Sequence, residues 1–246
     1  MKMLLGHEWV DRDDTIDVRD PFDDSIIDTV PAASHADLET ALATAAAARE
    51  TARAMTTYER AQVLYRTAGI IGDRIEEFAR TIAREGSKTI NEARGEARRC
   101  VNTLTIAAEE AKRLQGETIP FDSFPGGEAR RGYYERVPIG VVLAITPFND
   151  PLNLVAHKLG PAIAGGNSVI LKPATVTPLS GLKLTEAFME AGLPGGVLQC
   201  ITGYGAVLGD ALVEDSRVRM VSFTGGVEAG ERIMSRVGLK KIGMEL

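Results

Sequence analysis

Three polar side chains of this chain follow short apolar runs and are of types that can take part in chemistry. Asn149 comes shortly after the run Val141–Thr146, and an amide at the end of a strand can donate a hydrogen bond to a developing oxyanion. Lys172 ends another such run, where its ammonium can bind ribose hydroxyls or a phosphate. Glu245 stands between two apolar residues, and partial burial there would raise its pKa toward the range of a general base.

Each of these side chains also has an explanation without chemistry. Lys172 can simply extend to water, as lysines at strand ends often do. Asn149 lies next to a predicted helix start, in which Asp150 serves as the N-cap and Pro151 takes the first helical position. Because Asp150 is then the cap, Asn149 stays free for other contacts. Glu245 can be an exposed carboxylate near the end of the sequence.

Two glycine turns stand between a predicted strand and a predicted helix. Phe223-Thr224-Gly225-Gly226 would place backbone N–H groups at a helix N-terminus, which attracts a pyrophosphate. The segment Gly203–Gly209 is close to the dinucleotide fingerprint, but its third glycine comes one position late. Both turns can also serve tight turning and close packing alone. The sequence contains no P-loop motif for phosphate binding.

The other nucleophilic and metal-binding residue types offer little. His157 falls on a predicted helix, and we assign it no catalytic role. Cys100 falls on a helix stripe and Cys200 within a strand, so we interpret both as small buried hydrophobic residues rather than nucleophiles. Two cysteines at this spacing fit neither a disulfide framework nor a metal site, and we predict no bound metal.

The composition is that of a soluble globular protein, with 246 residues of which 44% are hydrophobic and 25% charged. The apolar runs are much shorter than the roughly 18 residues that a membrane span requires. The segment Met1–Asp14 is already charged, unlike a signal peptide. We therefore expect a cytoplasmic protein that does not bind membranes. The net charge of −6 also argues against a nucleic-acid partner.

Apolar residues at three- and four-residue steps predict three helices in the first half of the chain. The first begins at the capping box Ser34–Asp37 and reaches about Met55. The second begins at a similar box, Thr56–Glu59, and ends near Gly86. The third extends over about residues 89–114.

We predict an α/β fold with a Rossmann-like parallel sheet and helices on both faces. Short runs rich in Val and Ile, separated by helical patterns of crossover length, are typical of such a sheet, whose ligands bind at the carboxyl ends of the strands. Residues 1–120 form a helical N-terminal part, residues 121–140 a protruding β-hairpin arm around the alternating stretch Arg131–Val137, and residues 141–246 the dinucleotide-binding core. The predicted strands of the core are Val141–Thr146, Ser168–Lys172, Val197–Thr202, Arg219–Phe223 and Lys241–Glu245.

Several separated motifs together resemble the aldehyde dehydrogenase superfamily, in the order that this family shows. They extend over nearly the whole chain, which makes chance a poor explanation. In this family the catalytic cysteine follows the glutamate of the last motif, so the resemblance implies a chain truncated before that cysteine, with the catalytic domain absent. The matching segments are Pro147–Asn149, Lys158–Asn167, Leu171–Pro173, Glu190–Val197, Phe223–Gly225 and Glu245-Leu246.

The resemblance implies a role for each candidate residue. Asn149 would hold the aldehyde oxygen, Glu245 would activate a thiol or water, and Lys158 would lie near the proton path. Lys172 would contact the adenosine ribose, and the helix after Gly225 would face the pyrophosphate. The implied set of cofactor-binding residues is Thr146, Pro147, Phe148, Lys172, Thr175, Gly205, Phe223, Thr224, Gly225 and Gly226.

Two positions depart from the family pattern. Gly226 stands where the family often has a serine that reaches the phosphates, which leaves only backbone donors. Thr175 stands where a glutamate often binds the ribose hydroxyls. A carboxylate there would repel a 2′-phosphate, so its replacement by a hydroxyl lets the site accept NADP as well as NAD.

The sequence therefore favours the cofactor-binding half of an NAD(P)-dependent enzyme that oxidises an aldehyde to a carboxylic acid. We expect this half to be inactive by itself and to form a homo-oligomer when full length. The run Phe148–Asn153 resembles family branches that act on small polar aldehydes such as lactaldehyde or phosphonoacetaldehyde. The alternative is a non-catalytic nucleotide-binding or assembly subunit, which uses the hairpin arm to join partners.

Overall fold

The computed structural model describes residues 1–246 and centres on one seven-stranded sheet, with the strand order β11-β10-β7-β8-β9-β1-β2. Five neighbouring strands pair in parallel, so the predicted α/β fold with a parallel sheet is confirmed. Three of them, which lie at the centre of the seven-stranded sheet, are buried almost throughout, as strands covered on both faces must be. The parallel strands are β7 (Val141–Ile145), β8 (Ser168–Lys172), β9 (Leu198–Cys200), β10 (Val218–Thr224) and β11 (Lys241–Glu245).

Residues 1–33 contain four strands that the sequence analysis did not predict. β1 (Met3–Leu5) and β2 (Glu8–Val10) extend the main sheet beyond β9 as an antiparallel edge. β3 (Thr15–Arg19) and β4 (Ile26–Pro31) pair with each other in a separate sheet. Because β1 and β2 have three residues each, they are too short to show a period in the sequence.

Helices form where the sequence predicts them, but the first two predicted helices are each divided. The division falls at Ala48 in the first and at Arg74 in the second. Neither residue is of a type that normally ends a helix, so the sequence carries no signal for these breaks. The predicted capping boxes at Ser34 and Thr56 are both present. The helices of this region are α1 (His35–Ala47), α2 (Arg49–Ala54), α3 (Thr57–Asp73), α4 (Ile75–Gly86) and α5 (Ile90–Ala111).

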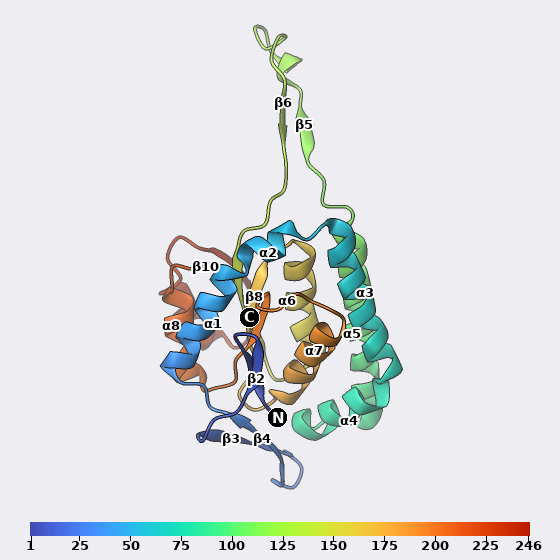
Figure 1. The fold of residues 1–246 in the computed structure, drawn as a ribbon, viewed down its shortest axis with the longest axis vertical. Helices are drawn as coiled ribbons and strands as arrows, with labels where there is room; N and C mark the ends of the chain where they lie inside the picture. Colours follow the sequence, from blue (N-terminus) through green and yellow to red (C-terminus); the bar gives the residue numbers. More distant parts are fainter.

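Helices cover both faces of the sheet, as predicted. α6 (Asn153–Ala164) and α7 (Leu179–Glu190) pack on one face, while α1 and α8 (Gly205–Glu214) pack on the other. α3, α4 and α5 form a second layer outside α6 and α7 (Figure 1). α9 (Val227–Met234) follows β10 in the chain. None of the helices combines the length and the apolar character that crossing a bilayer would demand.

A hairpin arm projects away from this body (Figure 1). Its strands β5 (Glu117–Ile119) and β6 (Gly132–Tyr134) pair antiparallel, and β6 is shorter than the predicted stretch Arg131–Val137. Tyr133 is 74% exposed and Phe124 is 48% exposed. The arm therefore presents aromatic surface that this chain does not bury.

α6 and α7 begin at the carboxyl edge of the sheet without an N-cap side chain of their own. Glu85 from the end of α4 caps α7, because its carboxylate accepts hydrogen bonds from the N–H groups of Leu179 at 2.8 Å and Ser180 at 2.7 Å. Burial raises the pKa of Glu85 to about 7, and the hydrogen bonds from α7 oppose that rise. The contact ties the outer helical layer to the start of α7.

We expect Glu85 to make the stability of the fold depend on pH. Its pKa rises from 4.5 to about 7 on folding. Between these two pH values, the folded chain therefore holds a proton on Glu85 that the unfolded chain has lost. The resulting stability is fully present below pH 4.5 and is lost as the pH rises to about 7, a change of about 3 kcal/mol. Glu85→Gln should lack this decline in unfolding free energy, measured by urea denaturation across that range. Parallel pH curves for the two proteins would contradict the expectation.

Candidate active site at the carboxyl edge of the sheet

The candidate residues start from neighbouring strands at one edge of the parallel sheet. Lys172 of β8 lies beside Ile145 of β7. Phe223 of β10 lies on the other side of Ile145. One residue further along, Thr224 of β10 pairs with Glu245 of β11. The strand ends that the sequence analysis grouped therefore lie together.

The order of the strands favours ligand binding at this edge. The chain proceeds from β7 through β8 to β9 on one side of β7, and it resumes with β10 on the other side. Ligands of open α/β sheets bind at such a switch point, outside the carboxyl ends of the strands. The loop that carries Asn149 leaves β7 at this point.

Lys158, Thr224 and Glu245 form a hydrogen-bonded chain. Lys158 of α6 donates to Thr224 Oγ1 at 2.8 Å and to Ser222 Oγ at 3.3 Å. The Thr224 hydroxyl donates to Glu245 Oε2 at 3.2 Å. Burial lowers the pKa of Lys158 to about 8, and the negative charge of Glu245 opposes the fall. A proton on Lys158 is thus connected through one hydroxyl to the carboxylate.

Glu245 is exposed, so the expectation of partial burial is wrong. β11 is an edge strand of the sheet, and its side chains have a neighbouring strand on one side only. The alternative of an exposed carboxylate therefore describes Glu245 within this chain. Its contact with Thr224 nevertheless keeps it at the crevice.

Lys172 does not extend to water, so that alternative is wrong. Its side chain is almost fully buried, with 4% exposed, and its ammonium donates to the Pro173 carbonyl oxygen at 3.1 Å. Burial lowers the pKa of Lys172 to about 8. An ammonium has three N–H donors, so further donors remain for a ligand. Lys172 also lines a cavity of about 410 Å³.

This cavity, named here the α8–α9 cavity, has residues of α8 and α9 in its walls. Gly205 and Gly209 line it on α8, and at both positions an added Cβ atom would meet nothing within 4 Å. α9 begins after Gly226 without a side-chain cap, so its first N–H groups are open to a ligand. At Gly225 an added Cβ would come 2.6 Å from the Phe223 ring, which restricts this turn to glycine.

Thr175 and Phe148 line a different cavity, of about 590 Å³, together with Tyr204. Thr175 donates a hydrogen bond to the Gly203 carbonyl oxygen at 3.0 Å, which ties the loop after β8 to the loop after β9. Five of the ten predicted cofactor residues thus line one or the other of these two cavities, three the first and two the second. A cavity of about 670 Å³ between α4, β4 and α7 is larger than either but is lined by none of these residues, so size alone does not identify the site.

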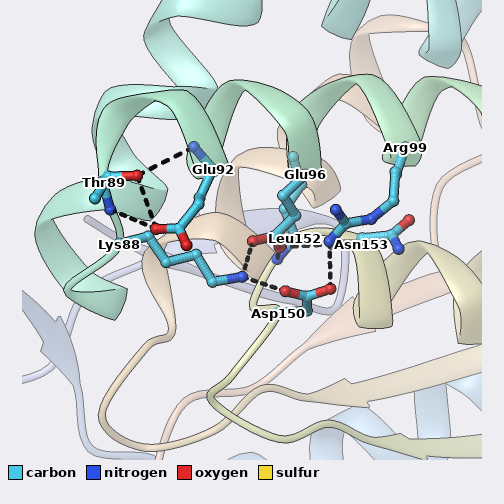
Figure 2. Close-up of polar contacts among 8 residues, drawn as sticks. All are labelled: Lys88, Thr89, Glu92, Glu96, Arg99, Asp150, Leu152 and Asn153. Atoms are coloured by element: carbon cyan, nitrogen blue, oxygen red, sulfur yellow. Dashed lines mark hydrogen bonds and ion pairs between the residues drawn. The ribbon is translucent and has the colours of Figure 1, made fainter.

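The loop that carries Asn149 is held by the helical layer, as Figure 2 shows. The Glu96 carboxylate of α5 accepts hydrogen bonds from the N–H groups of Leu152 at 2.8 Å and Asn153 at 3.1 Å, at the start of α6. Glu96 is fully buried, so these bonds are shielded from water. Asn149 itself is exposed, and its side-chain amide makes no hydrogen bond within the chain. The amide is therefore available to a ligand.

Asp150 joins the same network, so its predicted role as the N-cap of α6 is wrong. The Lys88 ammonium bonds to Asp150 and, at 2.7 Å, to Glu96, while Arg99 donates to Asp150 at 2.6 Å (Figure 2). Burial lowers the pKa of Lys88, but the two carboxylates outweigh burial and raise it above its usual value. Glu96 of another helix, α5, thus caps the start of α6. The residues around that start therefore carry no sequence signal of the cap.

Sequence reasoning missed Glu96, although one signal was present. Glu96 lies on the same stripe of α5 as Ala93, Ala97 and Cys100, and all four are buried. A charged residue on an apolar helix face predicts a buried partner, because an unpaired charge is unfavourable there. The sequence does not indicate that this partner is the backbone of α6.

The residues of this edge fit a bound dinucleotide. The Thr146 hydroxyl is buried without a hydrogen-bond partner, which a polar ligand would satisfy. The open N-terminus of α9 suits a pyrophosphate, and the ammonium of Lys172 suits a ribose hydroxyl or a phosphate oxygen. Pro147, between Thr146 and Phe148, is half-buried at the same strand end.

Neither cysteine is placed for nucleophilic chemistry. Cys100 in α5 and Cys200 in β9 are both fully buried. Burial raises the pKa of both thiols, to about 12 for Cys200. The prediction that both are buried hydrophobic residues is confirmed. His157 is exposed, and its ring lies 3.5 Å from the Thr103 hydroxyl.

Comparisons with known proteins agree on one family. The aldehyde dehydrogenase family matches residues 9–246. The chain is 50% identical over 231 residues to aspartate-semialdehyde dehydrogenase 1 of Pseudomonas canavaninivorans, covering 94% of this chain and 49% of that protein. It is 47% identical over 244 residues to the 3-sulfolactaldehyde dehydrogenase of Priestia megaterium, covering 99% of this chain and 51% of that protein.

Solved structures give the same result. The crystal structure of NADP-dependent glyceraldehyde-3-phosphate dehydrogenase from Bacillus halodurans, complexed with NADP, matches with a TM-score of 0.96 at 39% identity. The match covers 100% of this chain and 52% of that one. The chain thus spans about half the length of the relatives it matches.

Removal of the Glu96 carboxylate should destabilise the start of α6 and the fold. In Glu96→Ala two buried N–H groups lose their acceptor, and Lys88 loses one of its two partners. We expect the free energy of unfolding, measured by urea denaturation, to fall by about 3 kcal/mol. Glu92→Ala is the matched control, because Glu92 belongs to the exposed capping box of the same helix and should cause a clearly smaller loss. Equal losses in both variants would contradict the anchoring role of Glu96.

Proposed function

The chain belongs to the aldehyde dehydrogenase family, and we propose that it supplies the cofactor site, the oxyanion-binding amide and the general base for NAD(P)-dependent oxidation of an aldehyde to a carboxylic acid. The observation that carries this proposal is the convergence of chemical groups at one edge of the sheet. Lys172 and the Asn149 loop adjoin β7, while Lys158 is bonded through Thr224 to Glu245.

Asn149 would stabilise the oxyanion that forms when the aldehyde carbonyl is attacked. Its amide is exposed and unbonded, so it can donate to a substrate oxygen without breaking a contact. The loop is fixed at its far end by Glu96, which limits the reorganisation needed when charge develops. Donors that are already in place contribute most to such stabilisation.

Glu245 would act as the general base toward a thiol or a water molecule. The Thr224 hydroxyl donates to it and accepts from Lys158, which gives a proton a path from the exposed carboxylate to a buried amine. Because burial lowers the pKa of Lys158 to about 8, this amine can exchange a proton near neutral pH.

NAD or NADP would be held by residues on both sides of β7. Lys172 would bond a ribose hydroxyl, and the N–H groups that follow Gly225 and Gly226 would bond the pyrophosphate. The bound nicotinamide would accept the hydride that leaves the substrate. Thr146 contributes a buried hydroxyl that has no partner within the chain.

The covalent step would need a thiol that these residues do not supply. In enzymes of this family a cysteine attacks the aldehyde, and both cysteines here are buried with raised pKa values. We therefore propose that residues 1–246 alone do not oxidise aldehydes and that the nucleophile belongs to a segment outside them.

The hairpin arm would join copies of the full-length enzyme. It has only two strands, so both outer edges are unpaired along their length. Tyr133 and Tyr134 of β6 are 74% and 41% exposed. An exposed aromatic edge strand is suited to pairing with another chain.

The proposed substrate is a small polar aldehyde. The two relatives named above carry the names of aspartate semialdehyde and 3-sulfolactaldehyde, which are both of this kind. Polar side chains also lie near the Asn149 loop in this chain, where Thr103 donates to Asn153 at 2.9 Å and lies beside His157.

Thr175 should allow NADP to bind about as well as NAD. We expect dissociation constants of this chain for the two cofactors, measured by titration calorimetry, to lie within about tenfold of each other. Thr175→Glu should weaken NADP binding by about tenfold, because its carboxylate repels the 2′-phosphate. Thr175→Gln is the matched control, since it loses the same bond to Gly203 without gaining a charge. NADP binding weaker than NAD binding by about two orders of magnitude would contradict the role of Thr175.

The catalytic proposal is tested by extending the chain past Leu246 with the sequence that its own gene supplies. The extended protein should oxidise lactaldehyde or 3-sulfolactaldehyde with NAD or NADP, whereas residues 1–246 should not. Asn149→Ala in the extended protein should lower kcat by about 100-fold and leave cofactor binding unchanged. Asn102→Ala, an exposed position on α5, serves as the control. Full activity of residues 1–246 would contradict the proposal, and a reading frame that stops after Leu246 would favour the assembly subunit.

A further inference from the structure

The wall that α8 contributes to the α8–α9 cavity lacks side chains at two positions, which makes it flat there. Gly205 and Gly209 are four positions apart, so they lie on the same face of the helix, and both line the cavity. A Cβ at either position would meet nothing within 4 Å, so packing within the chain does not require glycine there. Glycine within a helix is less stable than alanine. The missing side chains therefore point to a planar group that lies against this face.

The strand ends and α9 add four apolar residues to the lining, beside the charged Glu228 and Arg232 of α9. Ile145 and Phe223 come from the adjacent ends of β7 and β10, and Ala229 and Ile233 come from α9. A cavity that has two positions without side chains and several apolar side chains in its lining suits an aromatic ring.

The residues that line this cavity indicate which half of a dinucleotide would enter it. Asn149, Thr224 and Glu245, which would surround the reacting carbon, do not line it, whereas Lys172 does. The nicotinamide would have to lie near those three residues. The cavity would therefore take the adenosine half, with the ribose near Lys172.

A bidentate ion pair also lines the cavity. Arg232 of α9 donates to Asp210 of α8 from Nε at 2.9 Å and from Nη2 at 2.6 Å, one bond to each carboxylate oxygen. Arg236 also approaches Oδ2, at 3.3 Å. Each carboxylate oxygen has two lone pairs, so Oδ1 keeps one acceptor position open. The Arg232 fork lowers the pKa of Asp210, which keeps the carboxylate ionised.

We propose that Asp210, oriented by Arg232, recognises the adenine base of the cofactor by accepting a hydrogen bond from its 6-amino group. This inference rests on the proposed dinucleotide function and adds a specificity to it. Hypoxanthine carries a carbonyl oxygen at the same ring position, and that oxygen would be repelled by the carboxylate. A site built around an acceptor rejects a ligand that presents another acceptor.

The test compares binding of NADP with binding of its analogue in which hypoxanthine replaces adenine. Titration calorimetry on residues 1–246 should show NADP preferred by about tenfold. In Asp210→Asn this preference should fall to near unity, because an amide can donate to the carbonyl oxygen of hypoxanthine. Glu214→Gln is the matched control: Glu214 bonds Arg236 in the same group of charges but does not line the cavity, so the preference should stay unchanged.

A second variant tests the position of the ring. Gly209→Ala should raise the melting temperature and weaken binding of both ligands, because the added methyl group occupies the flat wall. Gly69→Ala in α3, where a Cβ also meets nothing within 4 Å, should raise the melting temperature without changing binding. Unchanged affinity in Gly209→Ala would overturn the assignment of the cavity to the base.

The outcomes separate this inference from the cofactor function on which it rests. Equal binding of the two ligands to the unmodified chain would overturn the role of Asp210 and leave dinucleotide binding intact. An equal loss of both ligands in Asp210→Asn would assign the ion pair a structural role and also overturn the inference. If neither ligand binds, the cofactor function and the inference both fail.

Discussion

Two buried carboxylates connect the outer helical layer to the site, and the rest of the crevice depends on them. Glu96 of α5 caps α6, and Glu85 of α4 caps α7. Both helices begin where a strand-end loop finishes, so these contacts define the ends of the loops that follow β7 and β8. A buried carboxylate is tolerated only when its oxygen atoms are well bonded, and each of these accepts two backbone N–H groups. The helical layer is thereby part of the site's construction.

The two buried lysines of the crevice have no charged partner in direct contact. Lys158 bonds two hydroxyl groups and Lys172 bonds a backbone carbonyl, so neither forms a direct ion pair within the chain. Burial without a carboxylate partner is what lowers both pKa values to about 8. At neutral pH both amines still carry charge, which leaves positive potential in the crevice of a chain whose net charge is −6. That potential is complementary to the phosphates of a dinucleotide, and a partner carboxylate would have cancelled it.

The parallel sheet was predictable because β7 and β8 are buried on both faces, so that their sequences are nearly continuous apolar runs. The placement of Lys172 and Thr224 at one edge also follows, since all strands of a parallel sheet end at the same edge. The capping of α6 and α7 was not predictable, because Glu96 and its N–H donors are far apart in the sequence. β1 and β2 were not predicted for a different reason. Each has only three residues, which is too few to show a period, and β1 is held as a strand by its pairing with β9.

The exposed fractions of four candidate residues differ with their proposed roles. Lys172 and Thr146, which would serve the cofactor, are buried, whereas Asn149 and Glu245, which would serve the aldehyde, are exposed. Phe148 beside them is 64% exposed. An oxyanion donor and a general base act strongly only where water is excluded, because water weakens their electrostatic effect. The proposed aldehyde side would therefore act strongly only under a covering surface, whereas Lys172 and Thr146 of the proposed cofactor side are already buried. The proposed cofactor recognition would thus be physically separable from the chemistry, and it could be measured on this chain alone.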